Sequence, residues 1–329
     1  MNDADAASYV ARAHDIGIRW LREDFAWSIL EPRKGHFNWR LTDRLMRSAA
    51  LHGMNVLAGF GYAPAWANGG HADDKFPPLN PRDYAAAAVA VVRRYGRGGR
   101  FWRSHPRLPA RPLKAIELWN EPWVWVFWKP EPDVDAYARL VQATAPRIKA
   151  THPEIQILAS IDLQIDYTDG RDLSHGTRRH WEHGFLAQLL TRDYAFRSID
   201  GYAIHPYSDR GPYATTIPGY GDQEEAQQWL YQRLLIVRDM LRSAKRFKPL
   251  WSTELGWSTA RGVDEQTQAT YLRDALKRAV EEWRTFVARS FVYVLEKPHN
   301  GDPAGGYNLL REDLSPKPGW FELRNLLRG

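Results

Sequence analysis

The sequence predicts an α/β protein built as a (β/α)8 TIM barrel, and three observations support this fold class. Short apolar runs with strand character alternate with longer segments of helical periodicity. Such alternation indicates a parallel sheet whose strands are joined by crossover helices. The runs are regularly spaced without a linker-like segment, and 329 residues suffice for one large barrel. We therefore predict a single barrel domain over residues 1–329, with an open two-domain α/β protein as the alternative.

Seven runs have strand character, whereas a barrel of this kind needs eight. The runs cover residues 16–23, 55–62, 114–121, 155–160, 199–207, 249–256 and 290–296. Helical stretches cover residues 4–17, 40–53, 82–96, 133–151, 223–244 and 264–283. Gly53 and Gly96 stand where glycine commonly ends a helix. Because the chain opens on a helical stretch, we expect the first β-strand of the barrel to be missing at the N-terminus.

Composition narrows the classes of function. There is no Cys, which excludes disulfides and thiolate metal sites, and no pattern indicates another metal or a cofactor. The net charge is +6, but its densest Arg stretch (93–112) is predicted as a loop, and no nucleic-acid-binding motif accompanies it. No apolar run could span a membrane, and the N-terminus has no signal-peptide pattern. We expect neither a nucleic-acid nor a membrane partner.

Two carboxylates stand at the ends of predicted strands. Glu121 lies in the stretch "WNEP" at the end of run 114–121, and Glu254 lies in "STELGWS" at the end of run 249–256. In a (β/α)8 barrel the strand C-termini converge on the active-site face. Glycoside hydrolysis uses such a pair, with one protonated acid and one ionised carboxylate. A single Glu at a strand end is otherwise commonly an ion-pairing or loop-anchoring group.

These motifs resemble those of clan A (the 4/7 superfamily), the retaining glycoside hydrolases with a (β/α)8 barrel and catalytic Glu residues after strands four and seven. "WNEP" is similar to the acid/base motif after strand four, and "STELGWS" to the nucleophile motif after strand seven. The resemblance is closest to a family 39 and family 5-like group and runs from about residue 10 to the C-terminus. Further similar stretches lie at residues 20–39, 61–67, 203–207 and 305–323. Counted against this family, run 16–23 is strand two, so strand one is absent.

The resemblance implies roles for the residues in these motifs. Glu121 corresponds to the acid/base, and Glu254 to the nucleophile that forms a glycosyl-enzyme ester. Asn120 corresponds to the group that donates a hydrogen bond to the 2-hydroxyl of the sugar, an interaction that strengthens in the transition state. Arg22 is expected either to pair with Glu254, the nucleophile, or to form a structural ion pair at the end of the barrel.

Other residues are expected to line the sugar site. Tyr207 would donate to Glu254 or contact the sugar, and His205 would bond near the substrate or hold another site residue. Four tryptophans are candidate stacking platforms, of which one or two should touch sugar: Trp66, Trp123, Trp128 and Trp257.

The end of the last strand departs from the family pattern. Many clan members have a Trp there, beneath the sugar ring, whereas this chain has Leu295 and Glu296. By strand alternation, Tyr293 is expected to point away from the site unless the register shifts. Glu117 alternates with Glu121 and is expected to be structural, within a buried polar network.

The resulting prediction is a retaining O-glycosyl hydrolase that cleaves a β-linked oligo- or polysaccharide by double displacement. The alternative is a carbohydrate-binding barrel that kept the motifs but is catalytically impaired. The sequence leaves open the sugar and its linkage, endo or exo action and the oligomeric state. Localisation is also open, with export expected if an original signal was removed.

Overall fold

The computed structural model describes residues 3–166, 181–295 and 305–328. Contacts divide the chain into two compact units. The first, called here the β1–β5 unit, comprises residues 20–203 and 244–248, and the second, the β6–β7 unit, comprises residues 1–19, 204–243 and 249–329. The single domain over 1–329 remains a prediction, and each unit is described in turn below.

Five parallel strands in chain order make up the sheet of the β1–β5 unit, the last of which ends at the unit boundary. They are β1 (Trp20–Ala26), β2 (Asn55–Gly61), β3 (Ala115–Leu118), β4 (Gln156–Ser160) and β5 (Gly201–Ile204). All side chains of β3, and all those of β2 except Asn55, are buried, as expected when helices or other chain cover both faces of a parallel strand. All five predicted runs thus form strands, although the first begins at Trp20 instead of residue 16.

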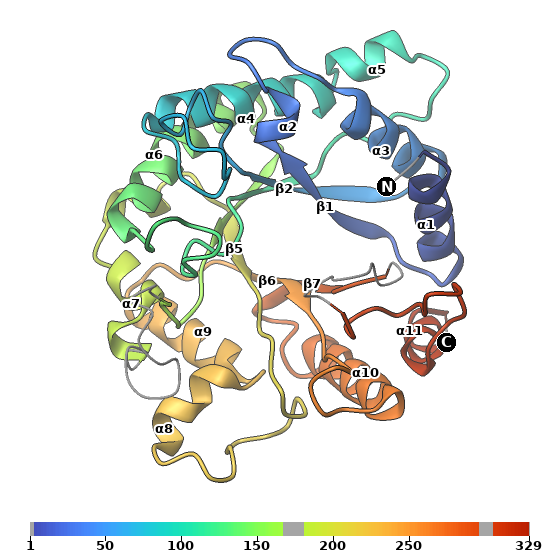
Figure 1. Cartoon of the computed structure of the whole chain (residues 1–329), viewed down its shortest axis with the longest axis vertical. Coiled ribbons are helices and arrows are strands. Elements are labelled where there is room, and N and C mark those ends of the chain that lie inside the picture. The colour runs from blue at the N-terminus through green and yellow to red at the C-terminus, as the bar shows by residue number, and fades with distance from the viewer. Residues whose placement is uncertain (1–2, 167–180, 296–304, 329) are drawn as a thin grey trace. The chain divides into compact units, whose positions relative to one another are not determined.

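Within this unit, helices follow each of the first four strands. They are α2 (Trp27–Leu30), α3 (Arg40–Leu51), α4 (Pro81–Tyr95), α5 (Arg100–Ser104), α6 (Val134–Thr151) and α7 (Phe185–Leu189). Helix α4 begins after Asn80, whose side chain accepts a hydrogen bond from the backbone of Arg82, with Pro81 at the first helical position. Helices α4 and α6 pack against each other and are drawn side by side in Figure 1.

The β6–β7 unit holds two parallel strands, β6 (Leu250–Leu255) and β7 (Val287–Val292), whose pairing contains two register shifts. Its helices are α1 (Asp3–Asp15), α8 (Gln223–Ala226), α9 (Arg233–Ser243), α10 (Glu265–Glu281) and α11 (Pro318–Arg328). Helix α10 packs on α11 (Figure 1). The continuous helix predicted over 223–244 is wrong, because a 3-10 turn and three non-helical residues separate α8 from α9.

The order of elements along the chain is that of a (β/α)8 barrel without its first strand. Helix α1 precedes β1, no strand precedes it in the described residues, and every one of the seven strands is followed by at least one helix. This order confirms the predicted fold class. Among the described residues, no helix is long and apolar enough to cross a bilayer.

Candidate active site

The segment that carries Glu121 leaves strand β3 in a strained conformation. Trp119 and Glu121 both have positive φ angles, 69° and 43°, which side chains other than glycine rarely adopt. Trp119 is fully buried, and its backbone N–H donates to the carbonyl of Phe60 and to the hydroxyl of Tyr84. Its indole N–H donates to the carbonyl of Phe127 at 2.7 Å. The surroundings therefore hold this strained turn in place, as is common at functional sites.

Ser160, at the end of β4, ties the same turn to the neighbouring strand. Its hydroxyl donates to the carbonyl of Trp119 at 2.6 Å, and its backbone N–H donates to the hydroxyl of Tyr137 at 2.6 Å. Tyr137 in turn donates to the carbonyl of Leu118. Burial raises the pKa of Tyr137 far above its ordinary value, so this hydroxyl stays protonated and neutral. Ser160 could not be identified from the sequence, because an isolated Ser in a strand is common.

A buried ion pair lies next to Asn120. The Nε of Arg22 in β1 is 2.7 Å from a carboxylate oxygen of Glu117 in β3, and Glu117 is fully buried. Nη2 of Arg22 also donates to the side-chain oxygen of Asn120 at 2.8 Å. The expectation that Glu117 belongs to a buried polar network is confirmed. The expected pairing of Arg22 with Glu254 remains a prediction, since these residues belong to different units.

This network orients the Asn120 amide. Because its oxygen accepts from Arg22, the amide nitrogen is the group left to donate to a ligand. That is the orientation required of a donor to a sugar hydroxyl.

In the β6–β7 unit, Glu254 near the end of β6 has a dedicated hydrogen-bond donor. The hydroxyl of Tyr207 donates to a carboxylate oxygen of Glu254 at 2.6 Å. The Nδ1 atom of His205 lies 3.6 Å from the same oxygen, and the His205 side chain is buried. The Glu254 side chain keeps 13% of its surface exposed, so the carboxylate is both held and accessible. The structure therefore brings together three of the residues predicted from the sequence.

Arg233, which the sequence analysis missed, holds the segment that carries His205 and Tyr207. Its Nη2 donates to the His205 carbonyl and its Nη1 to the Tyr207 carbonyl, both at 2.6 Å. Only 2% of Arg233 is exposed. The sequence could have indicated that Arg233 is buried, since it stands at four-residue spacing from Val237 and Leu241 on the buried face of α9.

Two further tyrosines surround Tyr207. The ring of Tyr307 lies 5.2 Å from the Tyr207 ring, and the ring of Tyr293 lies 6.1 Å from it, both edge-on. Tyr293 is expected to point away from the site unless the register shifts; the register does shift, and the Tyr293 ring contacts Tyr207. Strand alternation failed here because the β6–β7 pairing shifts register between Ser252 and Leu255, just before this point.

The four candidate tryptophans differ in exposure. Trp123, Trp128 and Trp257 are 1–2% exposed. Trp128 packs on the rings of Trp119 and Tyr137, so it fills the core. Burial argues against a stacking role for these three, because a sugar needs an open ring face. Trp66 is half-buried, packs edge-on against another ring and remains the candidate platform.

Removing the hydroxyl of Tyr207 tests its role at Glu254. We expect Tyr207→Phe to lower kcat by about 10- to 100-fold, because a hydrogen bond to a charged group is worth roughly 1.5–3 kcal/mol. Steady-state kinetics on an aryl β-glycoside measures this loss. Tyr213→Phe, at an exposed position, is the matched control and should keep full activity. Unchanged kcat in Tyr207→Phe would remove Tyr207 from the site.

Comparisons with known proteins point to one class of protein. The model of glycoside hydrolase family 42, described as beta-galactosidase, matches residues 2–78, whereas no curated protein matches the sequence. Among solved structures, a family 39 glycoside hydrolase from Bacteroides cellulosilyticus WH2 has a TM-score of 0.71 at 23% identity, covering 99% of this chain and 61% of that one. A monomeric beta-xylosidase from Caulobacter crescentus CB15 has a TM-score of 0.68 at 17% identity, covering 100% and 65%.

A third structure, a family 5 (GH5_18) protein from Streptomyces cattleya in complex with Manb1-4GlcNAc, has a TM-score of 0.63 at 15% identity, covering 100% of this chain and 76% of that one.

This chain spans less than two thirds of the length of the first two structures. The fold and the family match support the class of glycoside hydrolase barrels. The likeness to the family 39 and family 5 structures, at 23% identity or less, shows that this chain has their fold, as its motifs predict.

Proposed function

We propose that this protein is a retaining glycoside hydrolase that cleaves β-linked glycans, with Glu121 as acid/base and Glu254 as nucleophile. The observation that carries the proposal is the 2.6 Å hydrogen bond from Tyr207 to Glu254, near the end of β6. This bond, with His205 nearby, holds one oxygen of the carboxylate in place while the side chain remains partly exposed. The likeness to glycosidases with this fold supports the same class of reaction.

In the proposed first step, the protonated carboxyl of Glu121 donates its proton to the glycosidic oxygen. The bond between the anomeric carbon and that oxygen breaks, and Glu254 forms an ester with the anomeric carbon. The amide nitrogen of Asn120 donates to the 2-hydroxyl of the sugar. Arg22 supports this step indirectly, because it fixes the amide oxygen of Asn120.

In the second step, the now ionised Glu121 takes a proton from water. The water oxygen attacks the anomeric carbon, the ester bond to Glu254 breaks, and the sugar leaves with its original configuration. No metal or cofactor takes part in the proposed steps. The substrate class is an oligo- or polysaccharide, in keeping with the sugar complex of the Streptomyces cattleya structure.

Substitution of the acid/base tests this assignment. We expect Glu121→Gln to lower kcat/KM by about 10²- to 10⁴-fold on substrates with poor leaving groups, because general acid catalysis contributes that much. The loss should be smaller on a dinitrophenyl glycoside, whose leaving group needs no proton. Kinetics on both substrates measures the difference. Glu154→Gln, an exposed Glu of the same unit, is the control and should behave as wild type.

Added azide sharpens the same experiment. Azide should restore turnover of Glu121→Gln on the activated substrate and give a β-glycosyl azide, because it replaces water in the second step of a retaining reaction. A rescued product of α configuration would contradict the role of Glu121. Tight sugar binding without turnover by the wild-type protein would instead favour the alternative, a catalytically impaired carbohydrate-binding barrel.

A further inference from the structure

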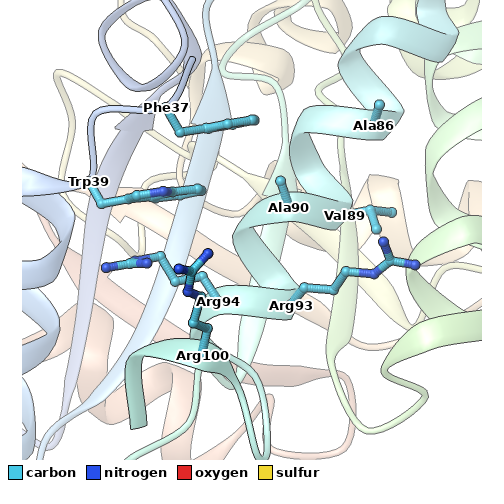
Figure 2. Close-up of a pocket in the computed structure, with 8 residues that line it drawn as sticks. All are labelled: Phe37, Trp39, Ala86, Val89, Ala90, Arg93, Arg94 and Arg100. Carbon is cyan, nitrogen blue, oxygen red and sulfur yellow. The ribbon is translucent and has the colours of Figure 1, made fainter. Parts of the chain in front are cut away.

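A hollow of about 310 Å³ lies along helix α4, in the β1–β5 unit. Small side chains of the helix form its floor, and aromatic and arginine side chains surround it (Figure 2). The side chains that line it are Phe37, Trp39, Ala86, Val89, Ala90, Arg93, Arg94 and Arg100. Its volume is at the lower end of the range for small-molecule sites, which suits a single sugar unit. None of these residues belongs to the strand-end segments that carry Glu121 or Asn120.

One wall of the hollow is a rigid aromatic stack. The rings of Phe37 and Trp39 are parallel, with centroids 4.7 Å apart and an angle of 4° between their planes (Figure 2). The Arg94 guanidinium lies 5.0 Å from the centroid of the Trp39 ring and forms two hydrogen bonds to Asp43. Arg94 is therefore neutralised and serves to hold the stack. Phe37 is half-buried and lines the hollow, so the stack presents apolar ring surface to a ligand there.

Two other arginines give the hollow an uncompensated positive charge. Arg93 and Arg100 are exposed, and no acidic partner of either guanidinium is found in the described part of the chain. Guanidinium groups bind carboxylates in a planar, bidentate geometry. The hollow thus combines an apolar ring wall with two cations, on a chain whose net charge is +6.

We propose that this hollow is a second glycan-binding site, which takes a uronate unit of an acidic polysaccharide. A uronate ring has an apolar C–H face suited to the aromatic wall and a carboxylate suited to Arg93 and Arg100. A neutral sugar leaves both cations unpaired. The residues that line the hollow do not include Glu121 or Asn120 of the same unit, so the proposed role of the hollow is to retain a polymer and not to act on it. The choice of a glycan as ligand rests on the proposed function.

Binding of trigalacturonate by the intact protein, measured by titration calorimetry, tests the proposal. We expect Arg93→Ala/Arg100→Ala to weaken binding about five- to tenfold, because an exposed ion pair contributes only modestly to affinity and two are lost. Arg97→Ala/Arg107→Ala is the matched control, since it removes the same charge from two exposed arginines outside the hollow, and should change affinity less than twofold. Phe37→Ala should also weaken binding, through loss of the ring face.

Equal weakening by the two double variants would overturn the proposal in favour of nonspecific charge attraction. Equal binding of a neutral mannotriose, or displacement of trigalacturonate by oligo(U) at equal concentration, would overturn the uronate assignment. Turnover of an aryl glycoside should be unchanged in Arg93→Ala/Arg100→Ala. Intact turnover with no trigalacturonate binding overturns this site alone, whereas binding without any turnover overturns the proposed catalytic function and leaves the site standing.

Discussion

Glu254→Gln is expected to lower kcat/KM by at least about 10⁴-fold on every glycoside substrate, including those with activated leaving groups. Removal of a nucleophile blocks the covalent step itself, and losses of this order are typical for nucleophiles that act as part of a catalytic unit. Gln has the shape of Glu and can still accept the hydrogen bond from Tyr207, so the fold should be retained. Steady-state kinetics on an aryl β-glycoside measures the loss, and circular dichroism checks the fold.

The leaving-group dependence separates Glu254 from Glu121. An acid/base variant recovers on an activated substrate, whereas a nucleophile variant does not. In Glu254→Gly, which removes the side chain, azide should attack from the side of the missing carboxylate and give an α-glycosyl azide, the opposite configuration to the product expected for Glu121→Gln. Glu224→Gln, an exposed Glu of the β6–β7 unit, is the matched control and should retain full activity. Near-wild-type activity in Glu254→Gln would contradict the assignment.

Much of the fold could be predicted from the sequence because its signals are local. Apolar runs of strand length and helices of 3.6-residue periodicity reflect burial of neighbouring residues, so all seven strands were found. Gly17, with a φ of 101°, follows the end of α1, and β1 begins only at Trp20 instead of residue 16. A glycine at the end of a helical stretch could have indicated this later start of the strand. The break between α8 and α9 had no such signal, because neither Gly nor Pro lies within 223–244.

The candidate site was predictable only where position along a strand decides it. Glu121 and Glu254 stand at or just after strand ends, which the pattern of apolar runs places correctly. Which side chains contact one another in the site depends on tertiary packing. Pairing of Arg22 in β1 with Glu117 in β3 depends on the register of both strands against β2, which lies between them, and the apolar pattern does not specify this register. For the same reason the sequence could not tell which of the four candidate tryptophans, among them the buried Trp128, has an open ring face.

The buried pair of Arg22 and Glu117 provides the largest expected effect on stability. Glu117→Leu should lower the free energy of unfolding by about 3–5 kcal/mol, because it leaves a nearly buried guanidinium without its carboxylate. The melting temperature should fall by on the order of 10 °C. Denaturant unfolding followed by circular dichroism measures the change. Asp239→Asn, which breaks the exposed pair with Arg238, is the control and should cost less than about 1 kcal/mol.

The double variant Arg22→Met/Glu117→Leu tells a structural role of the pair from a role in the site. Removing both charges should recover most of the lost stability, because no buried charge is left unpaired. Activity should nevertheless stay about tenfold or more below wild type, since Asn120 loses the donor that orients its amide. Recovery of activity together with stability would show that the pair only supports the fold. A stable but slow double variant supports the view that the strand-end network holds Asn120 for catalysis.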